Sequence, residues 1–112
     1  PSLATSGGSV SIVRVKAANG TDVNTLVAEV PVGGDPFSVT ATADGRRLFV
    51  SNAADGTVSV VDLGAVGEGP YVRVADVLVG AEPHGTAERD GKVYVANYGE
   101  GTLSVIDART LS

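Results

Sequence analysis

The chain has 112 residues and a formal net charge of −5, which is the size of one ordinary domain with an acidic balance. It contains no cysteine, and this excludes a disulfide framework, a thiolate nucleophile and a zinc ribbon. The basic residues are dispersed and no apolar run reaches the length of a membrane span, so we expect neither nucleic-acid binding nor membrane insertion.

Short segments rich in valine and threonine, separated by turn residues, predict an all-β chain. Apolar and polar residues alternate in residues 9–15, and Asn19 with Gly20 suits the turn that follows. Asp-Gly pairs at residues 44–45 and 90–91 indicate later hairpins. No segment has the apolar period of an amphipathic helix, so no helix is expected. The expected strands cover residues 9–15, 26–32, 37–42, 48–51, 57–62, 71–79, 84–88, 92–96 and 102–107.

The second half of the chain repeats part of the first. Residues 52–62 read Asn-Ala-Ala-Asp-Gly-Thr-Val-Ser-Val-Val-Asp, and residues 97–107 read Asn-Tyr-Gly-Glu-Gly-Thr-Leu-Ser-Val-Ile-Asp. A looser copy lies at residues 8–13. The spacing between copies slips only at turns, because a shift within a strand would exchange its buried and exposed faces. Strand-rich repeats of about 40 to 50 residues predict one four-stranded propeller blade per copy.

These motifs resemble the repeat of the YVTN-type β-propeller family. The resemblance is carried by Val-Gly-x-x-Pro at residues 32–36 and 79–83, by the stretches from Asp-Gly to Asn at 44–52 and 90–97, and by Gly-Thr-x-Ser-Val-x-Asp at 56–62 and 101–107. Tyr-Val-Ala-Asn at residues 94–97 stands where the name motif of the family falls. The same repeat is similar to that of lactonase-type seven-bladed propellers and of surface-layer proteins.

The resemblance implies where each blade begins and ends. In the family, the strands of a blade run from A at the central channel to D at the rim. Residues 8–36 then hold strands C and D of one blade, residues 37–79 a complete blade, and residues 84–107 strands A, B and C of a third. Residues 1–112 are therefore expected to form a partial propeller of about two and a quarter antiparallel blades. The resemblance also implies an extracellular or periplasmic protein.

So short a stretch does not close a ring, because propellers have about four to eight blades. Leaving the apolar faces of two outer blades exposed to water would lower the stability by on the order of 10 kcal/mol. We therefore expect the ring to be completed by a homo-oligomer, by a complementary propeller chain, or by the rest of a longer protein. The absence of methionine and the start at Pro1 favour a processed or cut form. A different closed all-β fold is the remaining alternative.

Loops at the expected channel mouth hold the candidate functional residues. His84, the only histidine, is a candidate ligand or general base, while its counterpart Phe37 favours a packing role instead. Acids and amides of the neighbouring loops can bind a polar ligand or Ca²⁺, the sole cofactor they suggest. They equally suit turns, where Asp and Asn cap their own backbone. The candidate ligand-binding residues are Asp35, Asn52, Glu82, His84, Asn97, Tyr98 and Glu100.

Repeated architecture without a unique reactive constellation favours a non-catalytic segment that serves as a scaffold or as a ligand- or protein-binding module. The alternative is part of a lactonase-type hydrolase, in which His84, Glu82 and Tyr98 contribute to a site completed by other blades. A third interpretation is a self-assembling propeller fragment. The sequence contains no Gly-x-Ser-x-Gly elbow that would mark a nucleophile, and one histidine excludes a metal site of several histidines within the chain.

Overall fold

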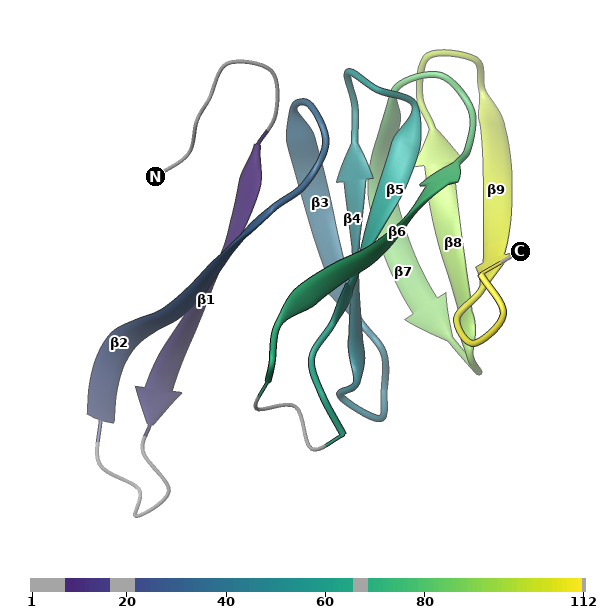
Figure 1. Ribbon diagram of the computed structural model, residues 1–112. Helices are drawn as coiled ribbons and strands as arrows, with labels where there is room; N and C mark the ends of the chain where they lie inside the picture. Colours follow the sequence, from purple (N-terminus) through teal and green to yellow (C-terminus); the bar gives the residue numbers. More distant parts are fainter. Residues whose placement is uncertain (1–7, 17–21, 66–68, 112) are drawn as a thin grey trace.

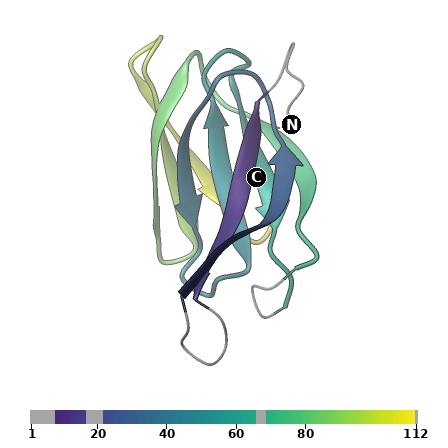
Figure 2. The same cartoon turned by 90° about the vertical axis from the view of Figure 1, so that its left-hand side faces the viewer.

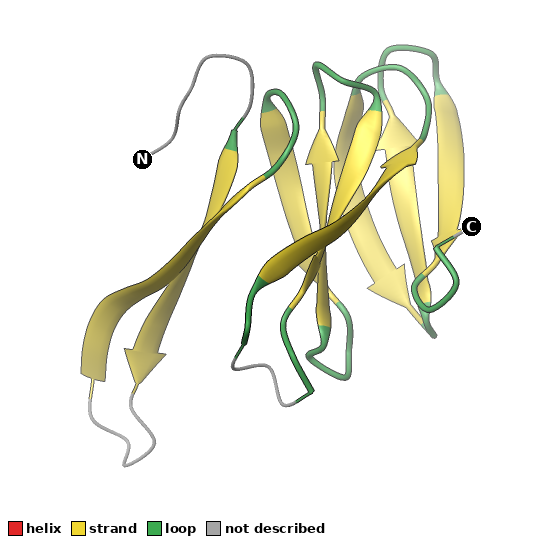
Figure 3. Cartoon of the chain, viewed as in Figure 1, coloured by secondary structure: helices red, strands yellow, loops and turns green. Residues whose placement is uncertain are grey.

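The computed structural model describes residues 8–16, 22–65 and 69–111, and the predicted turn at Asn19 and Gly20 lies outside them. Every element in these ranges is a strand (Figure 1, Figure 3). Within the same residues there is no helix that could cross a bilayer. The strands are β1 (Ser9–Lys16), β2 (Asp22–Pro31), β3 (Pro36–Ala41), β4 (Arg47–Asn52), β5 (Thr57–Asp62), β6 (Val72–Leu78), β7 (Pro83–Arg89), β8 (Lys92–Asn97) and β9 (Thr102–Asp107).

The strands form a first, a middle and a third sheet, all antiparallel. The first sheet holds β1 and β2, the middle sheet holds β3 to β6 in sequence order, and the third sheet holds β7 to β9. The sheets stand one behind another, as the turned view shows with the first sheet in front (Figure 2). The predicted all-β fold, a partial propeller built from antiparallel sheets, is confirmed.

The central strands of the middle sheet are buried on both faces. Phe49 pairs with Val60, and Leu48 pairs with Val61, across β4 and β5. Because neighbouring residues of a strand point to opposite faces, Phe49 and Val60 pack toward the third sheet while Leu48 and Val61 pack toward the first. A strand covered on both faces can carry apolar residues at adjacent positions, which explains why Val60 and Val61 of β5 are both apolar.

Two separate apolar cores join the three sheets, one on each side of the middle sheet. The innermost strands are also tied by hydroxyl groups, since Ser38 Oγ lies 2.9 Å from Thr86 Oγ1. The buried core members are Val10, Val30, Val32, Val50 and Val61 between the first and middle sheets, and Phe49, Val58, Val60, Val93, Val95, Ile106 and Ala108 between the middle and third sheets.

Equivalent positions of the repeat differ in burial between the middle and the third sheet. Val58 and Val60 on β5 are fully buried because the third sheet covers them. Their counterparts on β9, Leu103 and Val105, are 62% and 47% exposed. Tyr94 on the same face of β8 is also partly exposed. We call Tyr94, Leu103 and Val105 the open flank, because nothing in the described part of the chain covers them.

The two hairpins predicted from Asp-Gly pairs differ in length. At Asp90 and Gly91 both φ angles are positive, 53° and 80°, as a two-residue type I′ turn requires. At the earlier hairpin Thr42 N donates to Arg47 O, which encloses residues 43–46. The spacing between copies therefore changes inside a turn and leaves the faces of the flanking strands unchanged.

Candidate functional site

The turns predicted to meet at the channel mouth lie at one end of the sheets, the upper end in Figure 1. In the middle sheet, Ala53 N donates to Asp35 O at 2.9 Å. In the third sheet, Tyr98 N donates to Glu82 O at 2.9 Å. Each loop that enters a sheet is thus bonded to a turn of that same sheet. The predicted residues fall into two equivalent clusters, one at the middle sheet and one at the third.

Asn52 and Asn97, at the ends of β4 and β8, are 0% and 2% exposed. Asn97 Nδ2 donates to Ser104 Oγ at 2.8 Å, and Asn97 Oδ1 accepts from Gly80 N at 3.1 Å. Asn52 Nδ2 donates to Ser59 Oγ at 2.9 Å, and among the described residues its Oδ1 has no hydrogen-bond partner. These amides join strands and loops within the protein. Their predicted ligand role stays a prediction.

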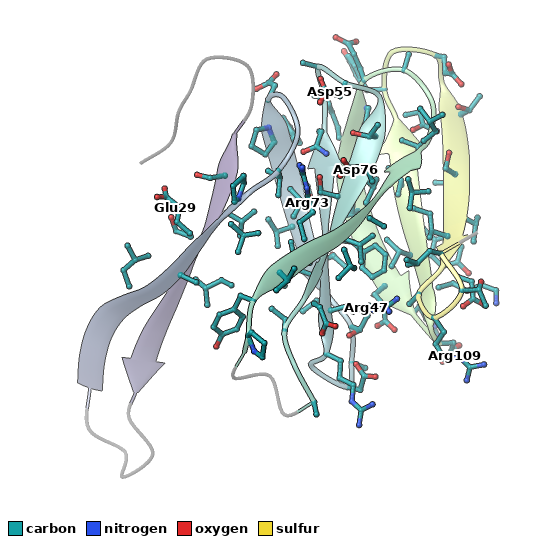
Figure 4. The ribbon with its side chains drawn as sticks, in the orientation of Figure 1. Glu29, Arg47, Asp55, Arg73, Asp76 and Arg109 are labelled. Carbon is teal, nitrogen blue, oxygen red and sulfur yellow. The ribbon has the colours of Figure 1, made fainter. Side chains whose placement is uncertain are left out.

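The acids of the turns accept hydrogen bonds from the entering loops. Asp55 Oδ2 accepts from Gly34 N at 2.8 Å, and Glu100 Oε1 accepts from Ala81 N at 3.2 Å. Figure 4 places Asp55 at the upper end of the middle sheet. A Cβ atom on Gly80 would lie 2.9 Å from the Cβ atom of Asn97, which is buried, so the close approach of these two residues depends on glycine. Sequence reasoning missed this requirement, although the repeated Val-Gly before each loop was its signal.

Asp35 and Glu82 take the left-handed backbone conformation, with φ angles of 54° and 51°. This conformation costs about 1–2 kcal/mol for a residue with a side chain, and its recurrence shows that the repeat sets the shape of both loops. Both residues are exposed. They are therefore the acids of the predicted set whose carboxylates are open to a ligand at the mouth.

His84 lies in an aromatic stack with Phe37 and Tyr98. Phe37 packs on one face of the imidazole, with ring centroids 4.1 Å apart and planes inclined by 12°. Tyr98 covers the other face at 4.8 Å and 6°. Phe37 is 60% exposed and Tyr98 is 72% exposed, so the stack is open to solvent at the mouth. The packing role that the counterpart position suggested for His84 thus describes its contacts, and Phe37 joins the site as a residue outside the predicted set.

The stack offers binding surface rather than an assembled nucleophile. Ser51 Oγ donates to the backbone oxygen of His84 at 2.6 Å. Within the described residues no hydroxyl or carboxylate bonds to the imidazole ring, and no group of three His, Asp or Glu residues could hold a metal ion. Flat rings and a ring nitrogen can stack on a ligand or form a hydrogen bond with it. Calcium binding through Asp35 and Glu82 stays a prediction.

Two carboxyl groups at the opposite end of the sheets have a lowered pKa. For Asp44 the Thr42 hydroxyl, which donates at 2.6 Å, lowers the pKa most, followed by the Arg46 backbone amide. For Asp107 the backbone amides of Arg109 and of the next residue lower the pKa. Hydrogen bonds to a carboxylate favour its charged form, so both groups hold their turns as anions.

The propeller geometry agrees with the comparison with protein families. A family model described as "Lactonase, 7-bladed beta-propeller" matches residues 2–111. The chain belongs to the seven-bladed lactonase propeller family. Its membership of a β-propeller family, predicted from the repeat, is thereby confirmed, and the three sheets are understood as successive blades of such a ring.

A solved structure supports the same fold for this lactonase-family chain. Kuenenia stuttgartiensis hydrazine synthase is similar, with a TM-score of 0.75 and 28% sequence identity. The match covers 92% of the present chain and 27% of the hydrazine synthase chain. The chain therefore spans little more than a quarter of the solved chain it resembles. Among curated proteins none matches it.

Proposed function

We propose that this chain is a non-catalytic, ring-building segment of a propeller, which serves as a scaffold and contributes a binding surface at the mouth. The observation that carries the proposal is the open flank. The same repeat positions that are fully buried in the middle sheet are exposed in the third. Exposed apolar faces of this kind mark interaction surfaces, so another blade is the natural cover.

The chemistry of the missing blade follows from the interface that is present. Val58 and Val60 of the middle sheet pack against Val93, Val95 and Ile106 of the third. The open flank carries the counterparts of the first two residues, so a face that is complementary to it offers β-branched aliphatic side chains at the matching positions. A blade of the same repeat, from a second copy, from a complementary chain or from the rest of a longer protein, meets this requirement.

The native mass of the chain tests the proposal. Light scattering of the purified chain is expected to give a mass well above 11.2 kDa, because copies associate through the open flank. A single-sized ring of copies would identify the self-assembling form, and open-ended association would identify a segment that needs other blades. A stable, soluble monomer with both flanks exposed would contradict the scaffold proposal.

A lactonase-type hydrolase is the second candidate, and the matching family model favours it. His84, with Glu82 and Tyr98 beside it at the mouth, would contribute to a site that other blades complete. His84→Phe is the sharpest probe, because Phe37 occupies the counterpart position and the variant keeps a ring in the stack. Lactone turnover that disappears in His84→Phe while the fold and mass are unchanged would support the enzyme. Unchanged turnover, or no turnover in either protein once other blades complete the ring, would remove it.

Two narrower proposals rest on the sequence resemblance. The repeat is of the YVTN type, supported by Tyr-Val-Ala-Asn at residues 94–97, and the protein works in an extracellular or periplasmic compartment. The aromatic stack and the exposed acids Asp35 and Glu82 supply the mouth with flat and anionic surface, which supports a ligand-binding role for that face. Fractionation of cells that produce the protein tests the location.

A further inference from the structure

A cleft of about 420 Å³ opens between the middle and third sheets, at the end opposite the mouth. Its walls come from the β3–β4 hairpin, the β7–β8 hairpin and the segment after β9. Both sheets that form it belong to this chain, so the cleft does not arise from a missing blade. The residues that matter to its chemistry are Asp44, Arg46, Arg47, Glu88, Ala108 and Arg109.

Arg47 spans the cleft from one sheet to the other. Its Nη1 donates to Ala108 O at 2.9 Å, and the side chain lies between the lower ends of the two sheets (Figure 4). A guanidinium group has five N–H donors in a fixed fork, and this bond fixes the orientation of the group while using one donor. Arg47 is therefore a pre-positioned cation in the cleft.

The other charges make the cleft a place for an anion. Arg46 and Arg109 also line it. Neither forms an ion pair within 4.0 Å in the described part of the chain, although Arg46 helps to lower the pKa of Asp44 and Arg109 that of Asp107. The two carboxylates of the cleft keep their charge and accept hydrogen bonds from backbone amides: Asp44 Oδ1 accepts from Arg46 N at 3.0 Å, and Glu88 Oε2 accepts from Gly91 N at 3.1 Å. Arginines thus outnumber carboxylates here, although the whole chain has a net charge of −5.

We propose that this cleft binds a small organic anion through a carboxylate or phosphate group. Arginine is suited to these groups because its planar fork meets two of their oxygens at once. The volume falls within the range of about 300–1,000 Å³ that is usual for small-molecule sites. The site is separate from the mouth, so it stands whether or not the mouth binds a ligand.

Calorimetric titrations of the full chain with inorganic phosphate and with citrate test the proposal. Saturable binding of either probe is expected, and the tighter probe identifies the head group. Each substitution removes a charge-assisted hydrogen bond to the anion, so Arg46→Gln and Arg109→Gln should each weaken binding about tenfold or more. Ala43→Phe, which narrows the cleft without changing its charge, should weaken binding as well.

Arg89→Gln is the matched control. Arg89 follows Glu88 on β7 and therefore points to the other face of the sheet, and it does not line the cleft. Its loss changes the net charge as the test variants do, and binding should be unaffected. Absence of saturable binding by both probes, or equal weakening by Arg89→Gln, would overturn the proposal. Circular dichroism of each variant separates loss of the site from loss of the fold.

Discussion

The open flank leads to a matched pair of substitutions at equivalent positions. Val58→Ala removes two carbons from a fully buried side chain, and with the cavity left behind it should lower the free energy of unfolding by about 2–3 kcal/mol. Leu103→Ala acts on the counterpart, which is 62% exposed in the chain alone. Its cost to the fold should stay below about 1 kcal/mol, since most of the removed surface already meets water.

Leu103→Ala, which costs the fold little, should instead have its main effect on association. When another blade covers the open flank, Leu103 becomes buried, and Leu103→Ala should weaken association by about tenfold, equivalent to 1.4 kcal/mol. Urea unfolding at low protein concentration measures the first effect, and sedimentation equilibrium measures the second. The reasoning fails if Leu103→Ala unfolds the chain as readily as Val58→Ala does while association is unchanged.

Two further predictions concern the loops and turns. Gly80→Ala forces a Cβ atom to within 2.9 Å of the Cβ atom of buried Asn97 and should destabilise the fold by about 1–3 kcal/mol in urea unfolding. Gly85→Ala, whose Cβ has nothing within 4 Å, is the control, and equal losses would contradict the close approach. The lowered pKa values of Asp44 and Asp107 mean that the unfolded chain binds more protons in acid. Their stabilising effect is therefore full above the unfolded pKa, near 3.8, and is lost as the pH falls through the folded values. Asp44→Asn should flatten the acid limb of a stability–pH curve, and an unchanged limb would show that the carboxylate is not responsible.

Much of the fold was accessible to sequence reasoning because the chain repeats itself. Turn residues mark the hairpins, and the similar segments at residues 52–62 and 97–107 indicate that β5 and β9 are equivalent strands of the repeat. Boundaries were less accessible. The second strand was expected from Leu26 but β2 begins at Asp22, because pairing with β1 extends a strand beyond its apolar part.

The candidate site was accessible only in outline. Its residues were placed at one end by the order of strands and loops, and the hydrogen bonds of Asp35 and Glu82 agree with that placement. Burial was not accessible, because Asn52 looks like any turn residue until the loop at Gly33 packs against it. The stack of Phe37, His84 and Tyr98 depends on the distance between two blades, which no local pattern records.

The arginine-lined cleft was missed for a related reason. Along the sequence the basic residues look dispersed, and Arg46 and Arg47 only stand beside a hairpin turn. Arg109, which also lines the cleft, follows β9, more than half the chain away. The cleft exists only because two sheets pack side by side. A cluster of charges contributed by two blades cannot be recognised from local sequence, whereas the repeated valines of the core can.

The covering of the open flank is tested most directly by thiol labelling, because the chain has no cysteine of its own. Leu103→Cys and Leu78→Cys each introduce one thiol at a position that is exposed in the chain alone, by 62% and 81%. In the assembled protein we predict slow labelling of the Leu103→Cys variant and fast labelling of the Leu78→Cys variant. Leu78 lies on the middle sheet, and the chain itself already supplies the sheets on both sides of it. Equal, fast labelling of the two variants would show that no blade covers the third sheet.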